Sequence, residues 1–402
     1  MLRSSLCMLL LIVSATSVYA ANENRIWLDA KINNQPVRLI FDTGCNTVVL
    51  FRSTAERLRL QITPPPPGIK PIPGTVLDGY TNSCELKLWN QTIKTRFNIV
   101  NMPKIADSEV EGLIGWPVLR SNIIEFNAKK GRMQPLSRLP AKVKSWQKFP
   151  IRSNSGCLVL EIPRADGGTD KVIIDTGSSE EVSLSSKLWR QWREEHPNDP
   201  ITLTAYYMPG SGTVIAPVMW ATRIHVGPIE LRNVMIKEAN ITETAIGGSN
   251  FLASLPMEAL ERKGLVVDGK GGYAFLSPQN SSADLPVYNR LGAVFAPSSP
   301  DTDDLIAHVA KNSPAERAGI RDGDILLKMG SRDMSDWRDQ PTPKTPPLTE
   351  QPEGTKLVLI LKREDVSYET TAVLEDILRP KDEKPELWQK ALRWVREHKP
   401  PL

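Results

Sequence analysis

The chain has 402 residues, with 50 Lys and Arg against 46 Asp and Glu, so its formal net charge is only +4. This near balance argues against a nucleic-acid-binding protein, because such proteins normally present a strongly basic domain or face. The length predicts two or three domains, and 40% hydrophobic with 24% charged residues is typical of a globular protein with a buried core.

The first 20 residues have the pattern of a secretory signal peptide. Arg3 precedes a short apolar core at residues 6–13, and Ala20 ends an A-x-A-like cleavage site. The alternative is an uncleaved membrane anchor, for which the apolar run is short. No later segment approaches the ~18 apolar residues of a membrane span. We therefore expect residues 1–20 to be removed and the mature protein to be secreted without a membrane-spanning segment.

Three cysteines remain after residue 20, namely Cys45, Cys84 and Cys157. An odd number forms no disulfide framework, and nothing in the sequence selects the pair that would make the one possible bridge. The four histidines show neither the HExxH pattern nor any close ligand spacing. We therefore expect no metal site.

A five-residue motif occurs twice. Ile40-Phe41-Asp42-Thr43-Gly44 recurs 133 residues later as Ile173-Ile174-Asp175-Thr176-Gly177. Two strand-like runs precede each copy, with Asn or Gly between them, which predicts a β-hairpin leading into each motif. A short helix is expected after each motif, at residues 53–58 and 186–195, where Ser residues supply caps.

A second element repeats at a similar distance downstream. Leu113-Ile114-Gly115 follows the first Asp by 73 residues, and Ala245-Ile246-Gly247 follows the second by 72. Each is followed by an apolar segment and a predicted hairpin. Two similar, mostly β units are therefore expected, at residues 21–140 and 141–284.

The repeated Asp-Thr-Gly suggests paired carboxylates. A lone copy is also compatible with a plain turn, since Asp and Gly are common turn residues. Here an apolar strand carries each Asp into a loop, Gly permits unusual backbone angles, and Thr offers a hydroxyl to brace the loop. Two such loops can place two carboxylates side by side, where they share one proton and act as acid and base together.

These residues resemble those of a known family. Residues 41–50 and 174–184 look like the active-site loops of aspartic proteases, and the two hydrophobic-hydrophobic-Gly elements look like those that close the same loops. The resemblance covers about residues 22–284 and implies two retropepsin-like lobes in one chain, as in bilobal pepsin-like enzymes but more compact. It implies that Asp42 and Asp175 form the catalytic dyad and hold a water that attacks the peptide carbonyl, without cofactor. It also implies that the loops are supported by Thr43, Gly44, Thr176, Gly177, Ser178, Gly115 and Gly247.

The resemblance also implies flaps over the substrate. In the first lobe the natural candidate is residues 73–84, with Tyr80 as the flap tyrosine, and its counterpart is residues 206–212. The alternative for Tyr80 is an ordinary tyrosine of a strand.

Residues 285–380 resemble a bacterial PDZ domain. The resemblance lies in Ser313-Pro314-Ala315, Ala318-Gly319-Ile320 and Asp322-Gly323-Asp324-Ile325. It implies capture of an extended peptide, with the carboxylate-binding loop at Leu291, Gly292, Ala293 and Val294. Five prolines in residues 341–352 leave room for only a very short helix. In the alternative, the domain packs on the protease and binds no peptide.

The predicted fold is therefore mainly β: two tandem, pseudo-twofold-related aspartic-protease lobes, a small α+β PDZ-like domain, and a helical tail at residues 381–402. The function expected from the resemblance is a secreted aspartic endopeptidase of a bacterial periplasm or envelope. It would act as a monomer on polypeptide substrates, with a peptide as a possible ligand of the PDZ-like domain and no nucleic-acid partner. The alternative is a catalytically inactive pseudoprotease that acts as a peptide-binding scaffold.

Overall fold

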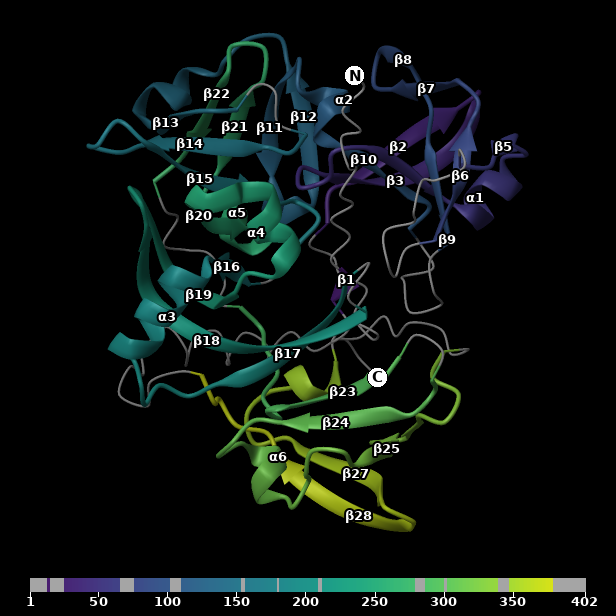
Figure 1. Ribbon diagram of the computed structural model, residues 1–402, viewed down its shortest axis with the longest axis vertical. Helices are drawn as coiled ribbons and strands as arrows, with labels where there is room; N and C mark the ends of the chain where they lie inside the picture. The colour runs from purple at the N-terminus through teal and green to yellow at the C-terminus, as the bar shows by residue number, and fades with distance from the viewer. Residues whose placement is uncertain are drawn as a thin grey trace, which may run out of the picture.

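The computed structural model describes residues 13–14, 25–65, 76–101, 110–152, 156–178, 181–208, 212–278, 286–299, 302–338 and 347–378. The protein is mainly β, as predicted, and the strands of the described residues form four sheets (Figure 1). Apart from the two-residue strand β1 (Val13–Ser14), the expected signal peptide lies outside the described residues, as does the tail at 381–402. No helix in the described part of the chain is long and apolar enough to cross a membrane.

The first unit is built on a nine-stranded sheet in the order β5-β6-β9-β4-β10-β3-β2-β7-β8. Asn33 and Asn34 turn the predicted first hairpin, both with positive φ (49° and 68°), which suits the short side chains found in tight hairpin turns. The predicted helix after the first motif is α1 (Arg52–Arg57). The strands are β2 (Trp27–Ile32), β3 (Gln35–Asp42), β4 (Val48–Phe51), β5 (Ile62–Thr63), β6 (Val76–Thr81), β7 (Cys84–Leu88), β8 (Gln91–Thr95), β9 (Asn98–Asn101) and β10 (Gly112–Gly115).

The second unit has an eight-stranded sheet in the order β1-β17-β18-β19-β16-β20-β15-β14. Its strands after β1 are β14 (Val159–Pro163), β15 (Thr169–Ile174), β16 (Val182–Leu184), β17 (Thr202–Met208), β18 (Gly212–Val226), β19 (Ile229–Glu238) and β20 (Phe251–Leu255). Its helices are α3 (Ser186–Glu195), which is the predicted one, α4 (Ile241–Gly247) and α5 (Met257–Arg262).

A five-stranded sheet joins the two units, in the order β12-β11-β21-β22-β13. The predicted closing hairpins form it, because β11 of the first unit pairs antiparallel with β21 of the second. One hydrophobic core runs from β2 to β22, so both units share it. The elements involved are α2 (Trp116–Leu119), β11 (Ile123–Asn127), β12 (Arg132–Leu136), β13 (Gln147–Pro150), β21 (Leu265–Asp268) and β22 (Tyr273–Leu276).

The C-terminal unit, residues 286–378, is a separate sheet in the order β23-β24-β25-β27-β28, with β26 paired to β25. Ser313 caps α6 as predicted, because its hydroxyl accepts the backbone N–H of Glu316. Of the proline-rich stretch at residues 341–352, the structure describes residues 347–352, which contain the three-residue 3-10 helix Leu348–Glu350. The elements are β23 (Ala293–Pro297), β24 (Leu305–Val309), α6 (Pro314–Arg317), β25 (Ile325–Met329), β26 (Arg332–Asp333), β27 (Lys356–Arg363) and β28 (Val366–Val373).

The C-terminal unit docks on the second unit through β23, which lies beneath β17 and β18 in Figure 1. Val294 of β23 is buried against Ala205 and Leu203 of β17 and Ile215 of β18. The contact therefore covers one face of the long β17–β18 hairpin.

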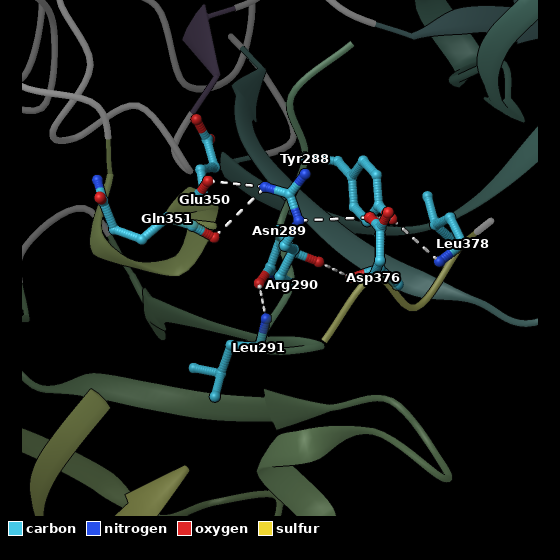
Figure 2. A network of polar contacts seen from close by, with 9 residues as sticks. Tyr288, Asn289, Arg290, Leu291, Glu350, Gln351, Asp376 and Leu378 are labelled. Atoms are coloured by element: carbon cyan, nitrogen blue, oxygen red, sulfur yellow. Dashed lines mark hydrogen bonds and ion pairs between the residues drawn. The ribbon is translucent and has the colours of Figure 1, made fainter. Parts of the chain in front are cut away.

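Arg290 ties together three segments at this junction (Figure 2). Its guanidinium donates to the backbone oxygen of Glu350 at 2.8 Å and pairs with Asp376 at 3.3 Å. The Tyr288 hydroxyl also donates to Asp376 and accepts the backbone N–H of Leu378. The strand entering the C-terminal unit is thus fixed to the segment leaving it.

Asn289 connects this junction to β17. The Thr202 hydroxyl donates to the Asn289 backbone oxygen at 2.7 Å, and Asn289 Nδ2 donates to the Leu203 oxygen at 3.1 Å. Asn289 Oδ1 accepts the backbone N–H groups of Leu291 and Gly292. One buried side chain therefore satisfies backbone groups on both sides of the contact.

Asn289→Ala should lower stability, because it leaves these buried backbone groups without their partner. We expect a loss of about 2–4 kcal/mol, since each unmade buried hydrogen bond costs roughly 1–3 kcal/mol, and a lower midpoint of thermal unfolding by circular dichroism. Asn198→Ala, at an exposed position, is the control. Equal midpoints for the two variants would contradict this role of Asn289.

Candidate active site

The two motif aspartates end equivalent strands. Asp42 is the last residue of β3, and Asp175 directly follows β15. Both side chains are buried, with 1% and 0% of their residue surface exposed. Phe41 and Ile174, which directly precede the two aspartates, pack into the shared core and carry the carboxyl groups inside with them.

The loops place the carboxyl groups against each other. Asp42 Oδ1 accepts the backbone N–H of Gly44 at 2.8 Å, and Asp175 Oδ1 accepts that of Gly177 at 3.0 Å. A Cβ atom on Gly44 would lie 2.7 Å from Asp175 Oδ1, and one on Gly177 would lie 2.5 Å from Asp42 Cγ. Any larger residue at either position would therefore collide with the carboxyl group of the other loop. The two carboxyl groups are close enough for each to influence the pKa of the other.

Thr43 and Thr176 brace the loops by crossed hydrogen bonds. The backbone N–H of each donates to the hydroxyl of the other at 3.0 Å. The Thr43 hydroxyl donates to the Ile174 oxygen at 2.7 Å, and the Thr176 hydroxyl donates to the Phe41 oxygen at 2.8 Å. The arrangement has the approximate twofold symmetry expected from the repeat. Ser178 is also buried, its N–H bonds to Asp175, and its oxygen accepts the N–H of Met257.

Burial and proximity keep protons on this pair. Burial, followed by the negative charge of Asp175, raises the pKa of Asp42 well above its usual value. Burial, followed by the charge of Glu243, raises the pKa of Asp175 to about 6. The pair can therefore hold one proton between an acid, Asp42, and a base, Asp175, at near-neutral pH.

Gly115 lies where the sequence predicted. In the parallel pairing of β10 with β3, Gly115 stands opposite Asp42, and its N–H donates to the Thr47 oxygen at 2.9 Å. A Cβ there would lie 2.4 Å from that oxygen. Glycine is needed because the backbones approach closely.

The prediction for Gly247 is wrong. This residue ends helix α4, and the strand beside β15 is β20, which pairs parallel with it up to Leu255. The Asp175 N–H donates to the Leu255 oxygen, so Pro256 stands where Gly115 stands in the first unit. The hydrophobic-hydrophobic-Gly pattern at Gly247 instead marks a helix C-terminus, where glycine is also common.

Tyr80 lies in strand β6, between β5 and β9. The contact made by its ring within the described residues is with the Arg96 guanidinium, at 5.7 Å from the ring centroid. The predicted first flap, residues 73–84, is corrected: β6 pairs with β5 and β9, whereas β7 pairs with β2 and β8, so the described strands of this segment do not form a hairpin with each other. Residues 73–75 of that segment, and residues 209–211 at the tip of the second candidate, lie outside the described residues. Tyr80 thus has the features of the strand tyrosine, and its role as a flap residue stays a prediction.

The predicted carboxylate-binding loop is not open. Leu291, Ala293 and Val294 are buried, and the N–H groups of Leu291 and Gly292 already bond to Asn289 Oδ1. The expected anion site is therefore corrected to an internal turn, because the asparagine two residues earlier takes the place of a ligand carboxylate.

The sequence did not reveal a cluster of buried charged side chains near Asp175, which we call the buried charge cluster. Lys237, Glu181 and Glu243 are each at most 6% exposed, and Tyr206 lies against the lysine. The one sequence signal was Asn240-x-x-Glu243, a pattern typical of a helix start, which gives no indication of where the glutamate points.

A match to a family model supports the resemblance of the first unit to aspartic proteases. Residues 28–118, which include the first Asp-Thr-Gly loop and Gly115, match the family model described as aspartyl protease. No curated protein matches the chain. Among solved structures, the retroviral protease-like domain of Ddi1 from Leishmania major matches 29% of this chain and 95% of its own length, with 16% identity and a TM-score of 0.23.

Thr43→Val should lower the stability of the protein against urea, because valine keeps the shape of the side chain but lacks the hydroxyl that links the two units. It removes the hydroxyl that bonds to Ile174 and Thr176, and each buried group left unpaired costs about 1–3 kcal/mol. We expect urea unfolding at clearly lower concentration than for Thr43→Ser, which keeps the hydroxyl. If the two variants unfold together, the crossed hydrogen bonds contribute little.

Proposed function

We propose that the protein is an aspartic-type endopeptidase that cleaves polypeptides with a water activated between Asp42 and Asp175. The observation that carries this proposal is the pair of buried carboxyl groups in contact, held by two symmetric Asp-Thr-Gly loops. Ionised Asp175 accepts a proton from the water as the water attacks the peptide carbonyl. Protonated Asp42 donates its own proton to the carbonyl oxygen, which gives a gem-diol intermediate. As the C–N bond breaks, Asp175 passes the proton taken from the water to the leaving amine nitrogen, and a gem-diol proton returns to Asp42, so the pair again holds one proton.

We propose that one chain forms the complete site. Both loops and their crossed hydrogen bonds come from the same chain, so a second copy has nothing to add to the dyad. The signal-peptide pattern of residues 1–20 supports the further proposal that the protein is exported and acts outside the cytoplasm.

We further propose that the PDZ-like C-terminal unit supports the β17–β18 hairpin and does not capture free C-termini. The packing of Val294 on that hairpin and the occupied N–H groups of Leu291 and Gly292 support this role. The tip of this hairpin is the predicted second flap. We expect that the base of the hairpin must be rigid if the flap is to hold a substrate in place.

Asp42→Asn and Asp175→Asn should each reduce cleavage of an unfolded protein by at least ~10²-fold, because each removes one member of the acid–base pair. Asp29→Asn, at an exposed position of β2, should keep full activity. Each variant should retain its circular dichroism spectrum. A dyad variant with near-normal turnover would exclude the proposed mechanism.

The pH profile tests the same dyad independently. Because Asp175 must be ionised and its pKa is raised to about 6, kcat/KM should rise with pH through a half-maximum near 6. A fluorogenic peptide assayed from pH 3 to 8 measures this limb. Full activity at pH 4 would show that the base has an ordinary carboxyl pKa.

Val294→Ala tests the supporting role of the C-terminal unit. The cavity left against β17 should loosen the hairpin base, with roughly 1 kcal/mol lost for a buried valine truncation, and kcat/KM on protein substrates should fall severalfold. Val366→Ala, 69% exposed on β28, is the matched control. Identical kinetics for both variants would show that this contact does not serve catalysis.

A further inference from the structure

Glu243 is a buried carboxyl group close to the dyad. It lies in the first turn of α4, which packs against β15 and β20 (Figure 1), and β15 leads directly into Asp175. Only 1% of Glu243 is exposed. A carboxyl group in this position is expensive to bury without a partner, so its presence calls for a physical reason.

Part of that reason is a helix cap. Glu243 Oε2 accepts the backbone N–H of Asn240 at 2.9 Å, and Asn240 Oδ1 accepts that of Glu243 at 2.9 Å. This reciprocal pair is a capping box. The cap uses one carboxyl oxygen and does not need a negative charge, because glutamine serves equally at this position.

The other oxygen is not explained by the cap. Glu243 Oε1 is buried and has no hydrogen-bond partner among the described residues, and the same holds for Asp175 Oδ2 and Ser254 Oγ. Ser254 lies in β20, opposite Ile173 of β15 and Ser183 of β16. Ser254 thus lies beside the last residues of β15, and α4 packs on the same strand through Ile246 and Ile173.

The charged groups that face Glu243 come from several elements. Lys237 of β19 pairs with Glu181 at 3.4 Å, and its ammonium lies 4.3 Å from the ring centroid of Tyr206 of β17. Burial opposes the lysine's charge, but Glu181 and the other neighbours outweigh it and hold the pKa of Lys237 above its usual value. Lys171 of β15 donates to the oxygen of Gly247 at the far end of α4.

The ionisation of Glu243 decides the net charge of this cluster. Lys237 and Glu181 form one ion pair, so an ionised Glu243 adds one net negative charge to the cluster. Burial, and to a smaller extent the charge of Glu181, raises the pKa of Glu243, whereas Lys237, the Asn240 N–H and the Ser183 hydroxyl oppose that rise. The field of Glu243 is the second cause, after burial, of the raised pKa of Asp175.

We infer that Glu243 is a third carboxyl group of the candidate active site, a positioning residue that makes Asp175 the stronger base for the water. This inference rests on the proposed protease function. A base works best when its pKa lies near the working pH, and a neighbouring carboxylate moves Asp175 in that direction. In this role Glu243 acts through Asp175 and is not a member of the acid–base pair itself.

The test compares two glutamates with the same structural task. Glu243→Gln keeps the capping box and removes only the charge. Glu316→Gln does the same in the capping turn of α6, where Glu316 accepts the Asn312 N–H and lies in the C-terminal unit. In the full chain, the acidic limb of kcat/KM for Glu243→Gln should move to lower pH by about half a unit to one unit, with a plateau lowered a few-fold. Glu316→Gln should leave the limb in place.

A limb that does not move in Glu243→Gln, or that moves equally in both variants, overturns the inference while the protease proposal stands. Active Asp42→Asn or Asp175→Asn enzyme would instead remove the proposed function itself.

A second measurement does not depend on activity or on the folding of Glu243→Gln. In the full chain carrying Asp42→Asn, with ¹³C-labelled aspartate and glutamate carboxyl groups, the NMR titration curves of Asp175 and Glu243 should each show an inflection at the other's pKa. Independent single-step titrations would overturn the coupling between the two groups.

Discussion

The crossed hydrogen bonds between Thr43 and Thr176 are the constraint on which the rest of the structure depends. They join the ends of two strands from different units, and they leave each glycine of the motif packed on the other loop's carboxyl group. Neither unit can shift without disturbing both aspartates. The continuous core and the shared five-stranded sheet are therefore part of the site, because they hold the two strands in register.

Burying the pair also affects stability, and the sign follows from the raised pKa values. An unfolded aspartate has a pKa near 4, and Asp175 has one of about 6 in the folded protein. The folded state binds the proton more tightly, so this stabilisation is complete below about pH 4 and is lost as the pH rises through 6. By neutral pH the difference for Asp175 is roughly 3 kcal/mol, which the shared apolar core must offset. The buried dyad thus lowers the stability of the folded protein at neutral pH.

The sequence predicted the parts of this arrangement that local patterns encode. The repeated motif, its preceding hairpins, Gly115 and the two following helices all rest on turn residues, caps or alternating apolar runs. Gly247 was misassigned because the same three-residue pattern suits a strand beside the loop and the end of a helix. The true counterpart uses Pro256, which has no N–H, so the bond made by the Gly115 N–H has no equivalent there. Glu243 and Asn289 act through contacts with distant segments, which a single sequence does not encode locally.

The two units differ most in what surrounds their aspartates, and in the second unit those surroundings are mechanically linked. Tyr206 and Ala205 are neighbours on β17, and successive side chains of a strand point to opposite faces. Tyr206 lies against Lys237 of the buried charge cluster, whereas Ala205 packs on Val294 of the C-terminal unit. A displacement of the C-terminal unit that moved β17 would therefore also alter the contact of Lys237 with Tyr206, and with it the field at Glu243 and Asp175. The docking of the C-terminal unit and the pKa of Asp175 thus depend on the same strand, β17.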